Sequence, residues 1–139
     1  VTLVHRCRVH FHKIQNYGDE RFFEGSALVD TGAWYTVVDL EIAKRIGVDY
    51  TGSILSLTSF LGHKVLCCEA LIRSITIEEK TVSPELIAVC SVSGSVRDLL
   101  KKYNVVEEVI IGTHTLEKLG YAVDVATHRL IESSGILMI

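Results

Sequence analysis

Hydrophobic residues fall into short segments that are separated by glycines and polar turns, a pattern typical of a β-sheet protein. The first strand is predicted over residues 3–14 and the second over residues 21–29, with a turn at residues 16–19 between them. A third, shorter strand is predicted over residues 36–38. The first part of the chain is therefore expected to consist mainly of strands.

Apolar segments further along the chain predict a hairpin and several shorter strands. Strands over residues 50–57 and 64–77 flank the glycine-containing segment 58–63, which predicts a long hairpin with that segment at its tip. The apolar run at residues 109–111 predicts a buried strand that ends at Gly112. The remaining strands are predicted over residues 86–92, 122–125 and 129–131.

Helical spacing interrupts this pattern at a few places. Asp39 is typical of a helix N-cap, Ile42 and Ile46 lie four residues apart on one helical face, and Gly47 ends the helix. A second helix is predicted over residues 95–103. A third helix is predicted over residues 113–119, with Leu116 and Leu119 facing inward and Gly120 as its C-cap.

The composition supports one mostly-β domain. The chain has 139 residues, of which 48% are hydrophobic and 22% charged, so that a packed core is feasible and extensive disorder is excluded. The β-branched residues Val, Ile and Thr make up more than a quarter of the chain, whereas proline occurs once, at Pro84. No repeat or low-complexity linker divides the sequence, and residues 1–139 are expected to form a single domain.

The charge excludes some classes of partner. The formal net charge is −3 and the isoelectric point is about 6.1. A mildly acidic chain without a basic cluster lacks the cations that displace counterions from phosphates, so no nucleic acid is expected as a partner. No apolar run reaches the ~18 residues of a membrane-spanning helix, so no membrane partner is expected either.

The four cysteines favour free thiols over a disulfide framework. Cys7, Cys67, Cys68 and Cys90 form no C-x-x-C pair, and their spacing does not require a disulfide, although it permits one. Free thiols fit a reducing compartment, which predicts a cytoplasmic location. Because neighbours in a strand point to opposite faces, at least one of Cys67 and Cys68 is expected to be buried.

The sequence L-V-D-T-G-A at residues 28–33 carries the clearest chemical signal. It places a carboxylate, Asp30, at the end of an apolar strand, followed by a hydroxyl and a glycine. Thr31 offers a hydrogen bond that braces the loop, and Gly32 lets backbone and substrate approach closely. A given tripeptide of this kind occurs by accident in about 3% of chains of this length. The alternative interpretation is a turn that merely ends a strand.

A second motif strengthens this signal. Two isoleucines, Ile110 and Ile111, precede Gly112 and a predicted helix, which echoes the first motif without its carboxylate. Taken together, D-T-G-A, the glycine-tipped hairpin and the later I-I-G resemble the single-domain, retropepsin-like aspartic proteases, a family that includes the retroviral proteases. The resemblance extends from about residue 22 to residue 125. It implies a mostly-β fold, a closed barrel with a flap hairpin and one to three short helices.

The resemblance also implies an activity and a set of site residues. Hydrolysis of a peptide by this chemistry needs two carboxylates that share a proton, and the chain has a single Asp-Thr-Gly. Two copies of Asp30 would then meet in a homodimer, without a cofactor or metal, to hydrolyse a peptide or protein substrate. The catalytic residues expected are Asp30, Thr31 and Gly32, and the substrate-binding residues expected are Ala33, Phe60, Leu61, Gly62 and Ile110.

Several positions differ from the family pattern. Trp34 and Tyr35 are bulkier than the residues that follow this motif in many relatives, and Thr113 stands where retroviral enzymes have an arginine that braces the loop. The hairpin tip has a single glycine, Gly62. These differences affect substrate preference and flap contacts more than the reaction. The family also implies that the chain ends, residues 2–10 and 135–139, pair between subunits.

Two alternatives to an enzyme remain. The first is a non-catalytic dimer of the same fold that binds peptides or proteins, and the second is an unrelated small β-barrel. A metal site at His5, His10 and His12 is not favoured, because no cysteine or carboxylate at a typical spacing completes the ligand set.

Overall fold

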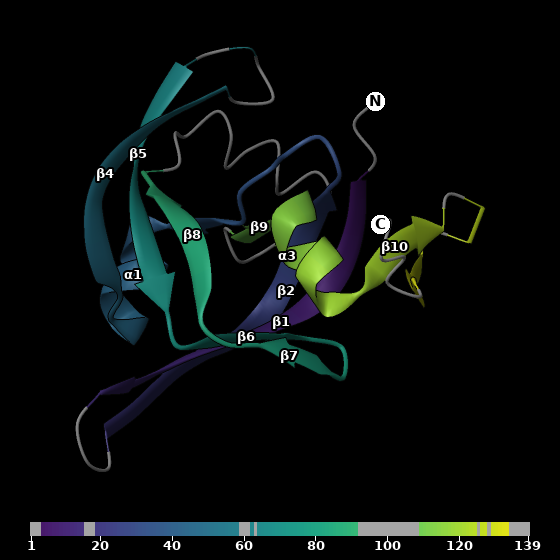
Figure 1. Cartoon of the computed structure of the whole chain (residues 1–139), viewed down its shortest axis with the longest axis horizontal. Helices are drawn as coiled ribbons and strands as arrows, with labels where there is room; N and C mark the ends of the chain where they lie inside the picture. Colours follow the sequence, from purple (N-terminus) through teal and green to yellow (C-terminus); the bar gives the residue numbers. More distant parts are fainter. Residues whose placement is uncertain are drawn as a thin grey trace, which may run out of the picture.

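One large sheet forms most of the computed structural model, which describes residues 4–15, 19–58, 62, 64–91, 109–124, 126–127 and 129–133 (Figure 1). A second sheet pairs β10 (Tyr121–Asp124) with β11 (Arg129–Glu132). The nine strands of the large sheet lie in the order β4 (Asp49–Thr58), β5 (Lys64–Ile72), β8 (Glu85–Cys90), β3 (Val37–Asp39), β9 (Val109–Ile111), β2 (Asp19–Asp30), β1 (Val4–Gln15), β6 (Ser74–Ile77) and β7 (Lys80–Val82).

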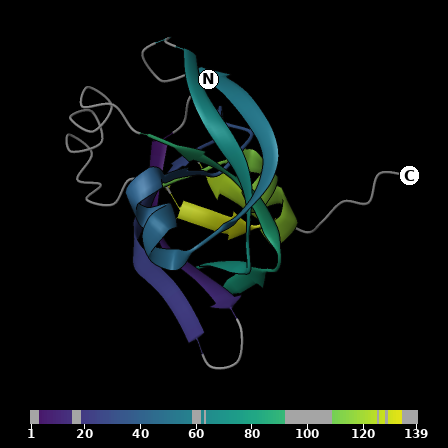
Figure 2. The same cartoon turned by 90° about the vertical axis from the view of Figure 1, so that its left-hand side faces the viewer.

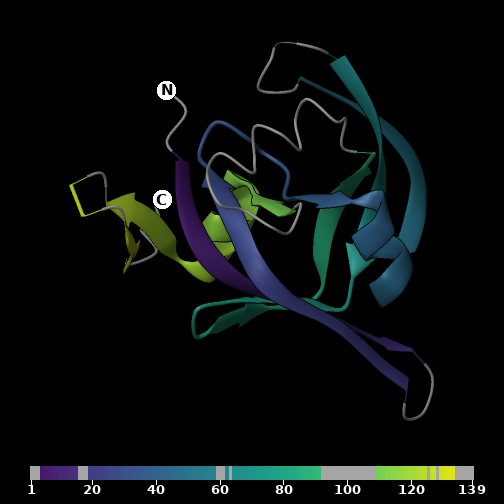
Figure 3. The same ribbon diagram turned by 180° about the vertical axis from the view of Figure 1, so that it is seen from behind.

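The first two predicted strands form a long antiparallel hairpin. β1 and β2 have 12 residues each, and their pairing runs from Val4 opposite Asp30 to Gln15 opposite Asp19. Figure 3 shows the hairpin as a ribbon that crosses the whole molecule. Each strand begins and ends within two residues of its predicted bounds, and the end of β2 places Asp30 near the centre of the sheet.

The centre of the sheet joins segments that are far apart in sequence. β9 lies between β2, to which it is parallel, and β3, to which it is antiparallel. Ile110 is thereby opposite Leu28 on one side and Val37 on the other. All three residues of β9 are buried, as expected for a continuous apolar run with a strand on each side.

Two short helices pack against the sheet. α1 (Leu40–Ile46) begins at Asp39, whose Oδ2 accepts a hydrogen bond from the Glu41 N–H at 3.1 Å, and ends at Gly47 with a φ of 70°. α3 (Thr113–Leu119) ends at Gly120, whose φ of 73° is left-handed. These two helices confirm the first and the third of the three predicted. Their buried residues contribute to the main core with Val29, Val38, Ile72, Ile75, Ile77, Ile87, Val109 and Ile111.

The strands after the central hairpin differ from the prediction. Residues 64–77 form two strands, because the chain changes partners at Arg73: β5 pairs with β4 and β8, whereas β6 pairs with β1 and β7. Strand-forming residues continue on both sides of Arg73, and their pattern does not reveal such a change of partner. β7 was not predicted, and it follows a turn at Glu78 and Glu79.

Some predicted features stay untested. In the described residues β4 and β7 are the edges of the large sheet, and no pairing joins them, so the closed barrel stays a prediction. The hairpin of β4 and β5 extends beyond the rest of the sheet, at the end of the molecule opposite β10 (Figures 1 and 2). The predicted helix over 95–103, the C-terminal segment 135–139, and the tip residues Phe60 and Leu61 lie outside the described residues.

The expectation that all cysteines are free is wrong. Cys67 of β5 and Cys90 of β8 are direct cross-strand neighbours and form a disulfide. The two cysteines are 23 residues apart in sequence, and no local pattern predicts that they pair. Cys68 is a free, exposed thiol, which confirms that Cys67 and Cys68 point to opposite faces.

Candidate active site

Asp30 is held at the end of β2 by its own turn. Its side chain is buried, with 7% of its surface exposed. The Asp30 Oδ1 accepts a hydrogen bond from the Gly32 N–H at 2.9 Å, and the Asp30 carbonyl accepts one from the Ala33 N–H at 3.1 Å. The turn predicted from the Asp-Thr-Gly sequence therefore fixes the carboxylate in one orientation.

Burial changes the acidity of Asp30. Loss of hydration raises the pKa of the Asp30 carboxyl above its usual value of 3.8, because a buried site disfavours the charged form. The Gly32 N–H acts in the opposite direction and is outweighed. A carboxyl that retains its proton more strongly than usual is suited to act as an acid near a second carboxylate.

The loop after Asp30 is attached to the start of α3. The Ala33 carbonyl accepts hydrogen bonds from the Thr113 N–H at 2.8 Å and from the Thr113 hydroxyl at 3.1 Å. The Trp34 carbonyl accepts one from the His114 N–H at 3.1 Å. Thr113 therefore braces this loop through neutral hydrogen bonds.

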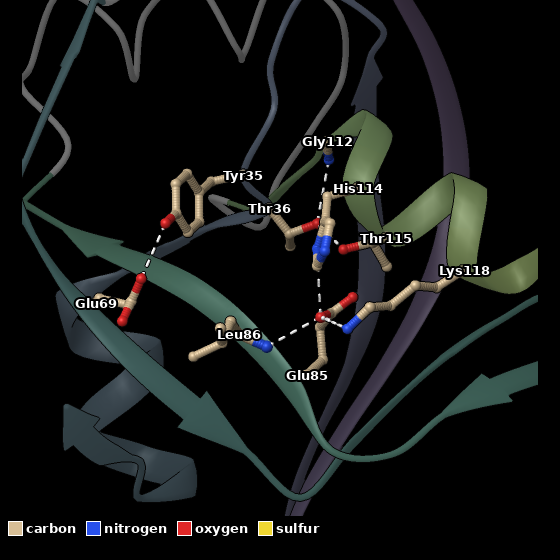
Figure 4. A network of polar contacts seen from close by, with 9 residues as sticks. All are labelled: Tyr35, Thr36, Glu69, Glu85, Leu86, Gly112, His114, Thr115 and Lys118. Atoms are coloured by element: carbon tan, nitrogen blue, oxygen red, sulfur yellow. Dashed lines mark hydrogen bonds and ion pairs between the residues drawn. The ribbon is translucent and has the colours of Figure 1, made fainter.

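Gly112 and two threonines complete the attachment. The Thr36 Oγ1 accepts a hydrogen bond from the Gly112 N–H at 3.1 Å and lies 2.6 Å from the Thr115 Oγ1 (Figure 4). Both threonines are fully buried. A Cβ on Gly112 would overlap the Tyr35 carbonyl group, so this close approach requires glycine. The glycine of the second motif thus lets the loop pack directly on α3.

Tyr35 connects the same loop to the hairpin of β4 and β5. Its hydroxyl donates to the Glu69 Oε2 at 2.8 Å (Figure 4). The Thr51 hydroxyl donates to the Glu69 Oε1 at 2.9 Å. The hydrogen bond to Glu69, and burial to a smaller degree, raise the pKa of the Tyr35 phenol. The loop that carries Asp30 is therefore tied both to α3 and to the hairpin whose tip is the predicted flap.

The predicted substrate-binding residues are only partly brought together. Ala33 is half-buried in the Asp30 turn. Ile110 is 8% exposed, and since Val109 and Ile111 belong to the main core, strand alternation turns Ile110 to the other face of the sheet. Gly62 is exposed at the hairpin tip with a φ of 80°. Thr31 is half-buried, and its role as a brace between subunits stays a prediction.

Sequence reasoning missed a group of polar residues beside this loop: Glu85, His114 and Lys118. Glu85 at the start of β8 lies within 3.0 Å of the Lys118 Nζ and 3.5 Å of the His114 Nδ1 (Figure 4). The spacing of His114 and Lys118, four residues apart on a predicted helix, places them on one face and was the available signal. Nothing in the sequence marks Glu85 as their partner. Among the described residues, no three His, Cys, Asp or Glu side chains are grouped to hold a metal ion.

No protein-family model matches the sequence, and no curated protein matches it. Solved structures do resemble the fold. The retroviral protease-like domain of Ddi1 from Leishmania major matches with a TM-score of 0.56 and 14% identity, over 94% of this chain and 89% of that one. A retropepsin-like aspartic protease from Rickettsia conorii matches with a TM-score of 0.47 and 17% identity, over 89% of this chain and 88% of that one.

None of the helices in the described part of the chain has the length and apolarity that crossing a membrane requires.

The central strands, the Asp30 turn and the attachment at Gly112 are contiguous at the centre of the sheet. Together with the wide coverage of the Leishmania domain, they establish that this chain has the retropepsin-like fold, as the sequence motifs predicted.

Proposed function

We propose that this protein is an aspartic endopeptidase that hydrolyses peptide bonds as a homodimer. The observation that carries the proposal is the Asp30 carboxyl, which is buried, fixed by the Gly32 N–H and raised in pKa at the end of a central strand. A turn that merely ended a strand would need none of these properties. The retropepsin-like fold supports the same activity.

The chemistry requires a second carboxylate. Two Asp30 side chains, one from each subunit, share a single proton because like charges at close range cannot both ionise. The ionised carboxylate takes a proton from a water molecule, which attacks the peptide carbonyl carbon, while the protonated one donates its proton to the carbonyl oxygen. No metal or organic cofactor takes part. Thr31 braces the loop across the subunit interface, and Gly32 keeps the carboxyls accessible.

The substrate proposed is an extended peptide or protein segment. Ile110 and Ala33 contact it from the side of the sheet, and the flap tip with Phe60, Leu61 and Gly62 covers it. Main-chain hydrogen bonds to flap and sheet hold the peptide extended, and apolar side chains fill the pockets between them. In this arrangement the substrate lies in a tunnel between the two subunits, covered by their two flaps.

Substitution of Asp30 by Asn tests the proposal. Asp30→Asn should reduce the hydrolysis of a peptide library, followed by mass spectrometry, by about a thousandfold or more, because the shared proton and the base are both lost. Asp124→Asn is the matched control: this carboxylate lies at the end of β10 and accepts hydrogen bonds from its own turn, and its variant should retain activity.

The alternative function gives a different result. Full hydrolysis by Asp30→Asn would contradict the mechanism. A non-catalytic binding dimer would show no hydrolysis by the wild-type protein, while the Asp30→Asn variant would still bind peptide. The retropepsin-like fold already excludes an unrelated small barrel.

A further inference from the structure

We propose that Glu85 is a positioning residue for the Asp30 loop, which it holds in place through His114 and Lys118 of α3. The inference rests on the proposed function, because it assigns the loop a catalytic role. It also predicts a structural effect that can be measured without any activity.

The first step is the contact between Glu85 and α3. The Glu85 side chain is fully buried. Its Oε1 accepts a hydrogen bond from the Lys118 Nζ at 3.0 Å and lies 3.5 Å from the His114 Nδ1. The Leu86 N–H donates to the same oxygen at 2.9 Å. Figure 4 shows the His114 and Lys118 side chains converging on Glu85 from one face of α3. One carboxylate of β8 therefore contacts both the first and the last turn of this helix.

The second step runs from α3 to the loop. The His114 N–H donates to the Trp34 carbonyl at 3.1 Å, and the preceding Thr113 N–H donates to the Ala33 carbonyl at 2.8 Å. The His114 and Trp34 rings are also in contact, with their centroids 5.1 Å apart. Because the same residue binds Glu85 by its side chain and the loop by its backbone, a shift of His114 moves the loop directly.

Stability alone does not account for Glu85. Among the described residues, the Glu85 Oε2 is a buried side-chain oxygen without a hydrogen-bond partner. Burying a carboxylate with one oxygen unsatisfied is unfavourable, and an apolar side chain of similar size at such a position is commonly as stable or more so. A role in fixing the position of α3, and through α3 the position of the Asp30 loop, would explain why a carboxylate occupies this buried site.

The variants Glu85→Gln and Lys118→Met test this role. Each variant removes one charged partner from the contact between Glu85 and Lys118. Lys118→Arg is the conservative substitution, which keeps the positive charge. Glu41→Gln and Lys44→Met are the matched controls, since Glu41 and Lys44 form an exposed pair on α1 at 3.5 Å. The first readout is kcat and KM for a peptide that the wild-type protein cleaves. The second is the emission of Trp34, the single tryptophan of the chain.

Misplacement of a catalytic group lowers kcat more than it lowers binding. Glu85→Gln and Lys118→Met should therefore lower kcat by about ten-fold, with KM changed by less than about two-fold. The Trp34 emission maximum and its quenching by acrylamide should change in the same two variants. Lys118→Arg and both control variants should match the wild type.

Two results would overturn the inference. One is a Glu85→Gln variant with wild-type Trp34 emission and wild-type kcat. The other is a variant that unfolds at a lower urea concentration but whose folded fraction has unchanged kcat and emission, which would make Glu85 purely structural. If the wild-type protein cleaves no peptide, the proposed function fails, whereas Trp34 emission still decides whether Glu85 holds the loop.

Discussion

The position of the Asp30 side chain is fixed, but its charged form is disfavoured. The Gly32 N–H orients the carboxylate, while burial removes the water that would favour ionisation. Residues placed in this way for chemistry commonly reduce the stability of the fold that carries them. The stability of variants at Asp30 therefore reports on the site independently of any substrate.

Asp30→Asn should raise the melting temperature at neutral pH. The pKa of Asp30 is higher in the folded protein than in the unfolded chain, so its contribution to stability is complete below about pH 3.8 and is lost as the pH rises through the folded value. Asparagine does not ionise and avoids this loss. Thermal unfolding at pH 7 should show a gain of a few degrees for the variant.

The same comparison at pH 3.5 is the control, because the wild-type carboxyl is then mostly protonated and the gain should be small. An Asp30→Asn variant that is less stable than the wild type at pH 7 would contradict a raised pKa.

At the level of single residues, the sequence predicted what lies within one motif and missed what depends on contact across the chain. Asp30, Gly32 and Ala33 are consecutive, and their turn follows from composition. The need for glycine at residue 112 comes from the Tyr35 carbonyl, 77 residues away in sequence, and no local pattern reveals it. Glu85 was missed for the same reason.

Two elements, β5 and β8, are joined by a covalent bond beside the site. The Cys67–Cys90 disulfide belongs to a second apolar cluster, with Ala88 and the half-buried Tyr35, Val37, Leu55, Leu57 and Val65. Disulfides are typical of oxidising compartments, so the prediction of a cytoplasmic location loses the basis that free thiols gave it.

Reduction of this disulfide should destabilise the hairpin and the fold. Opening a cross-link between residues 23 apart should lower the free energy of unfolding by about 2–4 kcal/mol, because the unfolded chain regains conformational freedom. Urea unfolding with and without dithiothreitol measures the difference. A Cys68→Ala variant should respond like the wild type, whereas the Cys67→Ala, Cys90→Ala double variant should not respond to the reductant. An equal response by the double variant would contradict this assignment.

At the level of elements, strands and helices with a clear pattern were predicted within one or two residues. α1 has an N-cap aspartate and a glycine stop, and both are used as the sequence indicates. The division of residues 64–77 was missed, because strand-forming residues continue on both sides of Arg73 and only the strand partners change.

For the whole molecule, the proposed function predicts that activity depends on concentration. One chain has a single Asp-Thr-Gly, so a monomer has half of the catalytic dyad. Specific activity should fall on dilution below the dissociation constant of the dimer. Peptide hydrolysis measured over a dilution series, with sedimentation velocity at the same concentrations, tests this prediction.

Addition of excess Asp30→Asn chain serves as the control for that experiment. Mixed dimers contain one intact carboxylate, so activity should fall as the variant is added. Specific activity that is constant on dilution and in the mixture would indicate a complete site within one chain.

The position of β9 has a further consequence, for how the chain folds. The central strand comes from residues 109–111, yet its partners in β2 and β3 lie at residues 28–29 and 37–38. After β3, about seventy further residues must be synthesised before the strand that separates these two neighbours is available. A topology so rich in distant pairings has a high contact order and is expected to fold slowly. Until β9 is available, β2 and β3 each lack this strand partner, and unpaired strand edges favour aggregation during folding.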